Sequence, residues 1–419
     1  MTAIRPFRAL RYDPARVSLA QVLAPPYDVV AAQDRGMLYD RDPHNAVRLE
    51  LTRDVADEAA TDYAELRDTL ARWRGDGVLI RDREPAIYPL RQPFEAEDGT
   101  RGTREGFFAE LRLEDYARRI VRPHERTLAG PRADRLKVLR AARANLSPIF
   151  LLYADRGNAL AGRFDDTFAA PIASAAIGAG SLALARVDDE RVIRDVCAFL
   201  AERPVVVADG HHRYETGLAY RDERRRAGDG DGAHDWILAY FANAYAPGSL
   251  LLPIHRLILK GAPPTDAAWR ERLSGWQRRD VRIDAAGAIP ALLREHLEPL
   301  AGLHAFAADD ASGTLRLFWR PRTSPVELTV RVIHREVIEG VFELDEAAVA
   351  SGAIAYPKSA AQTARDLREG RGAVALYLNA LTAEDVFRVT EAGEVMPQKS
   401  TFFHPKLPTG LVFRVLDDG

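Results

Sequence analysis

One stretch of the chain decides how its centre folds: Pro204-Val205-Val206-Val207-Ala208-Asp209-Gly210-His211-His212-Arg213-Tyr214-Glu215. The segment from Pro204 to Ala208 is short, β-branched and bounded by proline, which predicts a buried strand. The pattern from Tyr214 to Arg226 predicts a helix. Gly210 is therefore expected at a strand-to-helix turn.

A turn of this kind favours an anion. Backbone N–H groups at the start of a helix lack intrahelical partners, and the helix dipole is positive there. His211, His212 and Arg213 add side-chain donors at the same place. We therefore predict a phosphate site formed by Asp209, Gly210, His211, His212 and Arg213. The alternative is plain helix capping with local hydrogen bonds. A zinc site is disfavoured, because adjacent histidines serve one metal less well than histidines four residues apart on a helix.

Composition indicates a globular protein with a large core. The chain has 419 residues, of which 47% are hydrophobic, and its 58 Lys and Arg against 61 Asp and Glu give a net charge of -3. This balance disfavours non-specific binding to DNA. Cys197 is the only cysteine, which excludes an intrachain disulfide. The sequence has no apolar leader and no run of eighteen apolar residues, so we expect a soluble cytoplasmic protein without a membrane segment. The oligomeric state cannot be read from the sequence.

Helical and strand patterns alternate along the chain, which predicts an α/β protein with mixed sheets. We expect three parts, at residues 1–105, 106–260 and 261–419. In the first part we predict a strand at 46–51, a helix at 55–73 and a hairpin formed by strands at 86–95 and 103–111. In the second, we predict helices at 131–144 and from a cap at Asp188 to Glu202, and strands at 148–153, 236–244 and 250–259.

Three further segments carry chemistry. Pro123-His124-Glu125-Arg126-Thr127 contains a carboxylate that is either a general base or a surface ion-pair partner of a neighbouring arginine. Pro25-Pro26-Tyr27-Asp28 is a stiff turn that either is structural or presents Tyr27 and Asp28 to a cleft. Lys399, Ser400 and Thr401, with Lys406 after them, are either phosphate ligands or one polar face of a strand.

These segments occur in the order and approximate spacing of a bacterial and archaeal family called domain of unknown function 1015, which the chain resembles over essentially its whole length. The resemblance implies a ParB/sulfiredoxin-like core flanked by N- and C-terminal α/β regions. That superfamily includes partition proteins, sulfiredoxins that use ATP, and an archaeal ADP-dependent free-serine kinase. Pro123-His124-Glu125 is similar to the kinase segment that carries its proposed catalytic carboxylate, which implies that Glu125 is the base.

The sequence therefore predicts a nucleotide-dependent phosphotransferase that acts on a small hydroxylated metabolite. Glu125, His211 and His212 are the expected catalytic residues, with ATP or ADP and Mg²⁺ as cofactors and Asp209 as the metal ligand. Tyr27, Asp28, His124 and Arg126 are the expected substrate contacts. Lys399, Ser400 and Thr401 are expected to assist the phosphate turn. No Walker A loop or dinucleotide fingerprint is present. A phosphatase or other hydrolase, and a regulator that binds nucleotide or DNA without turnover, are the alternatives.

Overall fold

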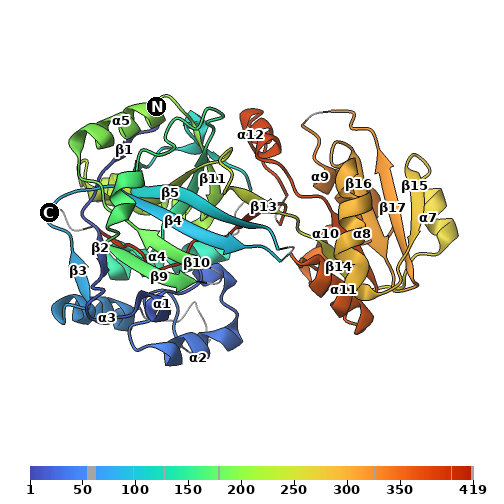
Figure 1. Ribbon diagram of the computed structural model, residues 1–419, viewed down its shortest axis with the longest axis horizontal. Coiled ribbons are helices and arrows are strands. Elements are labelled where there is room, and N and C mark those ends of the chain that lie inside the picture. The colour runs from blue at the N-terminus through green and yellow to red at the C-terminus, as the bar shows by residue number, and fades with distance from the viewer. Residues whose placement is uncertain are drawn as a thin grey trace. The chain divides into compact units, whose positions relative to one another are not determined.

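The computed structural model describes residues 1–53, 63–97, 99–125, 129–177, 180–324, 326–397 and 399–416. The chain divides into two compact units: residues 1–250 with 405–419, and residues 251–404. Both have the mixed α/β character expected from the sequence (Figure 1). The three-part division at residues 105 and 260 stays a prediction.

A large mixed sheet forms the centre of the first unit, with strand order β6-β11-β8-β12-β5-β4-β10-β9 and β1 paired with β5. Two pairs are parallel, β6 with β11 and β8 with β12, and the others are antiparallel. The strands are β1 (Ile4–Arg5), β4 (Tyr88–Glu95), β5 (Arg101–Arg112), β6 (Val121–Pro123), β8 (Ile149–Tyr153), β9 (Ala173–Ile177), β10 (Gly180–Leu184), β11 (Val205–Asp209) and β12 (Trp236–Asn243).

Helices α5 (Glu190–Ala201) and α6 (His211–Arg226) contribute side chains to the core on this sheet. Val196 and Leu200 of α5 and Tyr214 of α6 pack with Val205 and Val207 of β11 in one buried cluster. α6 also packs along α4 (Ala129–Ala142). The first turn of α6 is thereby held at the end of β11.

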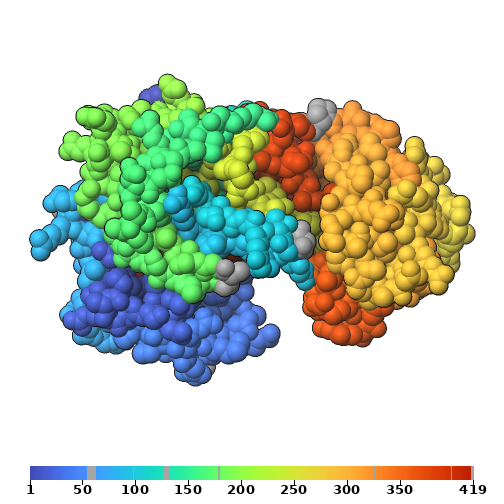
Figure 2. Space-filling view, viewed as in Figure 1, coloured from blue at the N-terminus to red at the C-terminus, as the bar shows by residue number. Residues whose placement is uncertain are grey.

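Short elements complete the first unit. Figure 2 shows the N-terminal segment (blue) at the surface of this unit. The remaining elements are β2 (Leu10–Tyr12), α1 (Leu19–Val22), η1 (Tyr27–Val29), α2 (Ala32–Arg41), η2 (Ala46–Leu49), α3 (Ala64–Gly75), β3 (Leu79–Arg81), η3 (Tyr116–Arg118), β7 (Ala144–Asn145), η4 (Asp165–Ala169), η5 (Ala233–Asp235) and β21 (Arg414–Val415).

The second unit has its own sheet, with strand order β15-β17-β16-β19-β14-β18. Its strands are β14 (Arg256–Ile258), β15 (Gln277–Arg282), β16 (His304–Asp309), β17 (Thr314–Arg320), β18 (Ile354–Ala355) and β19 (Val374–Leu378). Its helices are α7 (Asp266–Arg272), η6 (Ala286–Ala288), α8 (Ile289–His296), η7 (Glu298–Leu300), α9 (Thr329–Ile333), η8 (His334–Glu339), α10 (Glu346–Ala350), α11 (Ala360–Arg368) and α12 (Ala383–Glu391). A two-stranded ribbon joins β13 (Leu250–Leu252) and β20 (Phe402–His404).

Most predicted elements of the first unit are confirmed, including the hairpin β4–β5, β8, β11 and α6. Four details of the predicted elements differ. The prediction of one strand at 250–259 is wrong, because β13 (Leu250–Leu252) and β14 (Arg256–Ile258) are separate strands of different sheets. The strand predicted at 46–51 is wrong, because Ala46–Leu49 forms the short helix η2, whose backbone turn is capped by the Asn45 side chain. The cap of α5 is Asp189 and not Asp188. The helix predicted at 55–73 is α3 from Ala64 onward, and residues 54–62 lie outside the described residues.

Candidate functional site

Gly210 forms the turn between β11 and α6. Its φ of +88° and ψ of 29° lie in the left-handed region, which glycine adopts without strain. A Cβ at this position would lie 2.9 Å from Nε of Arg213, so the space beside the turn is already occupied. α6 begins here without a side-chain cap. Glycine is therefore required here by both the backbone conformation and the packing. The free backbone N–H groups of the first turn of α6 lie at the end of β11.

A break in strand pairing sets the direction of Asp209. The register between β11 and β8 shifts after Val207, so that Asp209 lies opposite Phe150. Phe150 lies opposite Tyr240 of β12. Because opposed residues share a face of a sheet, Asp209 lies on the face of Phe150 and Tyr240, whereas regular alternation would place it on the face of Val207.

Each carboxylate oxygen of Asp209 is held by a cation. Oδ1 lies 2.8 Å from Nζ of Lys406, and Oδ2 lies 2.8 Å from Nη2 of Arg213. Burial raises the pKa of this carboxyl, but the charges of Lys406 and Arg213 outweigh burial and hold the pKa well below its ordinary value. Asp209 is therefore ionised at neutral pH. The Mg²⁺ predicted at Asp209 would compete with both cations for these oxygens.

Arg213 ties the turn to its surroundings. Its Nη1 donates to the carbonyl oxygen of Pro148 and its Nη2 to Asp209. Its Nε is buried and has no hydrogen-bond partner among the described residues. The guanidinium carbon also lies 6.0 Å from the ring centre of Tyr27. The two hydrogen bonds of Arg213 thus fix β11 and α6, and Nε is a buried donor that neither bond uses.

The Pro123-His124-Glu125 segment lies directly beside the turn. β6 pairs in parallel with β11, with Val207 opposite Pro123, so both strands end at the same edge of the sheet. The backbone N–H of His124 donates a 3.2 Å hydrogen bond to Nε2 of His211, and Nδ1 of His124 bonds the carbonyl oxygen of Val207. The two imidazole rings are 4.6 Å apart at a 67° angle. The structure therefore brings Glu125 and the Gly210 turn, 85 positions apart, to one place.

The protonation of His211 follows from these contacts. Burial, followed by the neighbouring His124, lowers the pKa of His211 to about 3. The ring is therefore neutral at physiological pH. Since Nε2 accepts a hydrogen bond, the single ring proton lies on Nδ1, where it can be donated. Glu125 is partly buried, and its Oε1 lies 3.5 Å from Nε2 of His124.

Tyr27, Asp28 and His212 lie around the other side of the turn. Burial lowers the pKa of His212, and the carboxylates of Glu215 and Asp28 oppose that shift. Burial raises the pKa of Tyr27 to about 12, with Arg213 and Arg135 acting in the opposite direction, so the phenol stays neutral. Asp28 also acts on Arg213. η1 is therefore within electrostatic reach of the α6 N-terminus.

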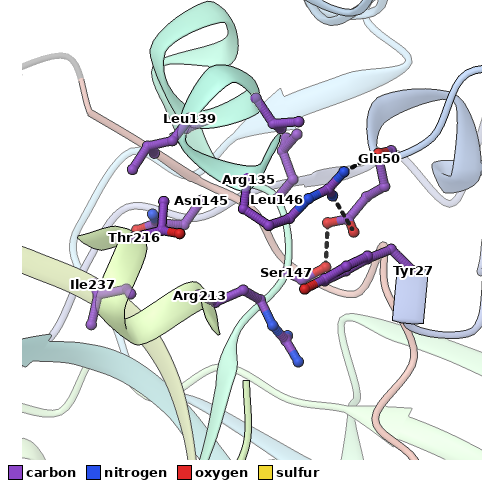
Figure 3. A pocket seen from close by; sticks show the side chains of 12 residues that line it. Tyr27, Glu50, Arg135, Leu139, Asn145, Leu146, Ser147, Arg213, Thr216 and Ile237 are labelled. Carbon is purple, nitrogen blue, oxygen red and sulfur yellow. Dashed lines mark hydrogen bonds and ion pairs between the residues drawn. The ribbon is translucent and has the colours of Figure 1, made fainter. Parts of the chain in front are cut away.

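A cavity of about 50 Å³ adjoins Arg213 on this side (Figure 3). Glu50, which is buried, accepts a hydrogen bond from Ser147 and lies 3.7 Å from Nη1 of Arg135. Arg135 stacks over Tyr27 at 4.1 Å. Tyr27 and Arg213 of this lining were candidate site residues in the sequence, whereas Glu50 and Arg135 were not, because Glu50 fell in a predicted strand and Arg135 in a predicted helix. The residues that carry its polar groups are Tyr27, Glu50, Arg135, Asn145, Ser147, Arg213 and Thr216.

The predicted roles of Lys399, Ser400, Thr401 and Arg126 at this site stay predictions. Lys399, Ser400 and Thr401 belong to the second unit, where Oγ of Ser400 donates to the carbonyl of Pro397 and Lys399 has a φ of 58°. Lys406, five residues beyond Thr401, is the basic residue that reaches Asp209. Arg126 lies outside the described residues. Within the described ranges, no group of three His, Cys, Asp or Glu side chains could hold a metal ion, and no helix could cross a membrane.

Comparisons with known proteins give a family and several solved structures. A family model described as "Protein of unknown function (DUF1015)" matches residues 4–307. No curated protein matches the chain. The structure is similar to a conserved hypothetical protein from Pyrococcus furiosus, with 14% identity and a TM-score of 0.36 over 74% of this chain and 95% of that one.

Two further structures have similar coverage. A mutant free serine kinase in complex with ADP has 12% identity and a TM-score of 0.38 over 74% of this chain and 92% of its own. SbnI with C-terminal truncation from Staphylococcus aureus has 12% identity and a TM-score of 0.34 over 74% and 90%. At TM-scores below 0.5, these likenesses carry no argument about the activity of this chain.

Proposed function

The chain belongs to the DUF1015 family, and we propose that it is a nucleotide-dependent phosphotransferase that acts on a hydroxyl group of a small metabolite. The nucleotide phosphates bind at the Asp209-Gly210-His211-His212-Arg213 turn. The ParB/sulfiredoxin-like character of the core, and ATP or ADP as the donor, are parts of the same proposal. Glu125 accepts the proton of the attacking hydroxyl.

The observation that carries this proposal is the hydrogen bond from the His124 backbone to His211. It joins the segment of the carboxylate to the helix start that favours an anion. Phosphoryl transfer needs donors for phosphate oxygens and, within reach of them, a carboxylate that takes a proton. Parallel pairing of β6 and β11 supports the presence of both groups at one sheet edge.

The donors in this proposal come from the first turn of α6. Its backbone N–H groups face the phosphates, and the Nδ1–H of neutral His211 donates without adding charge. His212 is half-buried beside it and contacts the transferred group. Asp209 is the residue that would hold Mg²⁺ bound with a nucleotide, through water, since Lys406 and Arg213 hold both Asp209 oxygens. The ion would neutralise negative charge on the phosphates.

The acceptor metabolite would lie between Glu125 and η1. Tyr27 offers a neutral hydroxyl, and Asp28 offers a carboxylate near the turn. His124 contributes mainly by orientation, because its backbone and ring are both engaged with the turn.

Turnover in a defined mixture tests the proposal. Purified protein is incubated with ATP or ADP, Mg²⁺ and a panel of hydroxylated metabolites that includes serine, and products are followed by phosphorus NMR. We expect a phosphorylated metabolite. Glu125→Gln should lower turnover by about 10²- to 10⁴-fold while nucleotide affinity is kept. Glu202→Gln, which removes an exposed carboxylate at the end of α5, is the matched control.

Two outcomes would reject the proposal. If the protein forms no phosphorylated product and binds no nucleotide, a nucleotide-dependent activity is rejected. Release of inorganic phosphate from phosphoserine without nucleotide would instead assign the same turn to a hydrolase, because a phosphate site does not by itself set the direction of transfer.

A further inference from the structure

Asp209 interacts with three positively charged side chains. Lys406 and Arg213 bind its two oxygens, and Arg104 of β5 acts on it electrostatically from within the sheet face. Arg104 stacks over Phe150 at 4.6 Å, and Phe150 is the residue opposite Asp209. Three cations thus converge on one carboxylate.

In the part of the chain that the structure describes, no carboxylate forms an ion pair with Arg104. Its exposed fraction is 1%, and its Nη2 donates to Oε1 of Gln92 at 2.6 Å. Nε and Nη1 are buried without an acceptor in hydrogen-bond geometry among the described residues. A guanidinium cannot lose its charge in a protein, so a charge this deep needs compensation from an anion nearby. Burial lowers the pKa of Arg104, and Tyr240 followed by the Asp209 carboxylate opposes that shift.

The same side chains anchor the backbone of Lys406. Gln92 accepts from Arg104 and donates from Nε2 to the carbonyl oxygen of Lys406 at 2.8 Å. The Lys406 side chain is 21% exposed. Its backbone is therefore fixed, and its four-carbon side chain can redirect the ammonium within a few ångströms.

We infer that Lys406 is a phosphate-binding residue of this site. When an anion occupies the α6 N-terminus, the Lys406 ammonium moves from the Asp209 carboxylate to the phosphate. Arg104 is the positioning residue that makes this exchange possible. With Lys406 withdrawn, Asp209 keeps Arg213 and the buried charge of Arg104, and its carboxylate is still compensated. This inference rests on the proposed function only for the location of the phosphate and not for catalysis.

The exchange has a consequence for Asp209. Its carboxylate competes with phosphate for the Lys406 ammonium. Removing the negative charge of Asp209 should therefore strengthen anion binding in the absence of metal. If Asp209 only supported the structure of the turn, its substitution would weaken anion binding. The Asn side chain retains an oxygen that can accept from Arg213.

Direct binding measurements on the full chain test the inference. Inorganic phosphate and ADP are titrated by calorimetry without divalent metal. Lys406→Met should lower affinity for both about 10- to 100-fold, the range for a lost charge-assisted hydrogen bond, and Lys406→Arg should restore most of it. Asp209→Asn should raise affinity for inorganic phosphate. Lys260→Met, an exposed lysine of the second unit, should change nothing.

A double-mutant cycle separates the role of Arg104. Arg104→Met should weaken phosphate binding in the natural background and have little effect in the Lys406→Met background, because Arg104 acts through Lys406. Arg104→Lys should restore part of the affinity. Circular dichroism identifies variants that fail to fold. If the Arg104 variants do not fold, phosphate binding by the Lys406 and Asp209 variants still tests the inference about Lys406.

Unchanged phosphate affinity in folded Lys406→Met, or weaker phosphate binding in Asp209→Asn, would overturn the inference. These outcomes are distinct from failure of the proposed function, which would appear as absent turnover. Phosphate binding that depends on Lys406 without any metabolite phosphorylation would keep the inference and reject the phosphotransferase.

Discussion

The backbone N–H of His124 donates a 3.2 Å hydrogen bond to Nε2 of His211, between residues 87 positions apart. This contact joins the ends of two parallel strands and fixes the tautomer of His211. A neutral imidazole that accepts at Nε2 carries its proton at Nδ1. The contact therefore decides both where Glu125 lies and which ring nitrogen of His211 can donate.

Changing His211 to glutamine should make stability less dependent on pH. The pKa of His211 is about 3 in the folded chain against an ordinary 6.5, so the unfolded chain binds more protons between these values. Stability therefore rises with pH in this window and falls as pH drops below about 6.5. Between pH 7.5 and 5 the natural chain should lose about 2 kcal/mol more than His211→Gln, whose side-chain oxygen can still accept from His124.

Urea unfolding at several pH values measures this difference. His334→Gln, at a half-exposed position of the second unit, serves as the control and should keep the natural pH dependence. An equal slope for natural chain and His211→Gln would show that His211 is accessible to protons in the folded state.

Substituting alanine for Gly210 should destabilise the chain and weaken anion binding. The φ of +88° is costly for any residue with a Cβ, and that atom would lie 2.9 Å from Nε of Arg213. We expect a loss of about 1–3 kcal/mol in unfolding free energy, with lower phosphate affinity because Arg213 must move.

A matched glycine is available in helix α2. A Cβ on Gly36 would meet nothing within 4 Å, so Gly36→Ala should stabilise the helix by up to about 1 kcal/mol. Thermal unfolding of both variants, with and without phosphate, checks the pair. Equal stability of the two variants would show that the Gly210 turn tolerates a side chain.

The buried Glu50 should contribute more to stability than its surface counterparts. Glu50→Gln removes the charge that faces Arg135, while the remaining amide oxygen can still accept the hydrogen bond from Ser147. Arg135 keeps Asp134 as a partner, so we expect a loss of about 2 kcal/mol rather than the full cost of an unpaired buried charge. Glu223→Gln, which breaks an exposed pair with Arg140, should change stability by less than about 0.5 kcal/mol. Chemical denaturation gives both values, and a Glu50→Gln variant as stable as Glu223→Gln would contradict this reading of the cavity.

Neutralising Asp28 should separate anion binding from turnover. Its carboxylate is exposed and opposes anions near Arg213 and His212, so Asp28→Asn should tighten ADP binding by a few fold at low salt. The gain should shrink as ionic strength rises. Turnover should fall if Asp28 holds the acceptor metabolite. Titration of ADP at two salt concentrations measures the first effect, and weaker ADP binding in Asp28→Asn would contradict it.

The sequence by itself determined the local elements and the turn. A β-branched run bounded by Pro204, followed by Gly210 and a helical pattern, encodes a strand, a left-handed residue and a helix start, because these depend on neighbouring residues alone. The strand predicted at 46–51 was wrong, because the helix cap formed by Asn45 outweighed the strand preference of a short apolar pattern.

Only the tertiary structure decided which distant residues meet. The parallel pairing of β6 with β11 placed His124 and Glu125 at the turn, and the register shift after Val207 aimed Asp209 at the face of Phe150. Arg104 and Lys406, 302 positions apart and without a shared motif, came together through Gln92 on that face. Strand order and register depend on burying whole faces of a sheet at once, and no local segment of the chain carries that information.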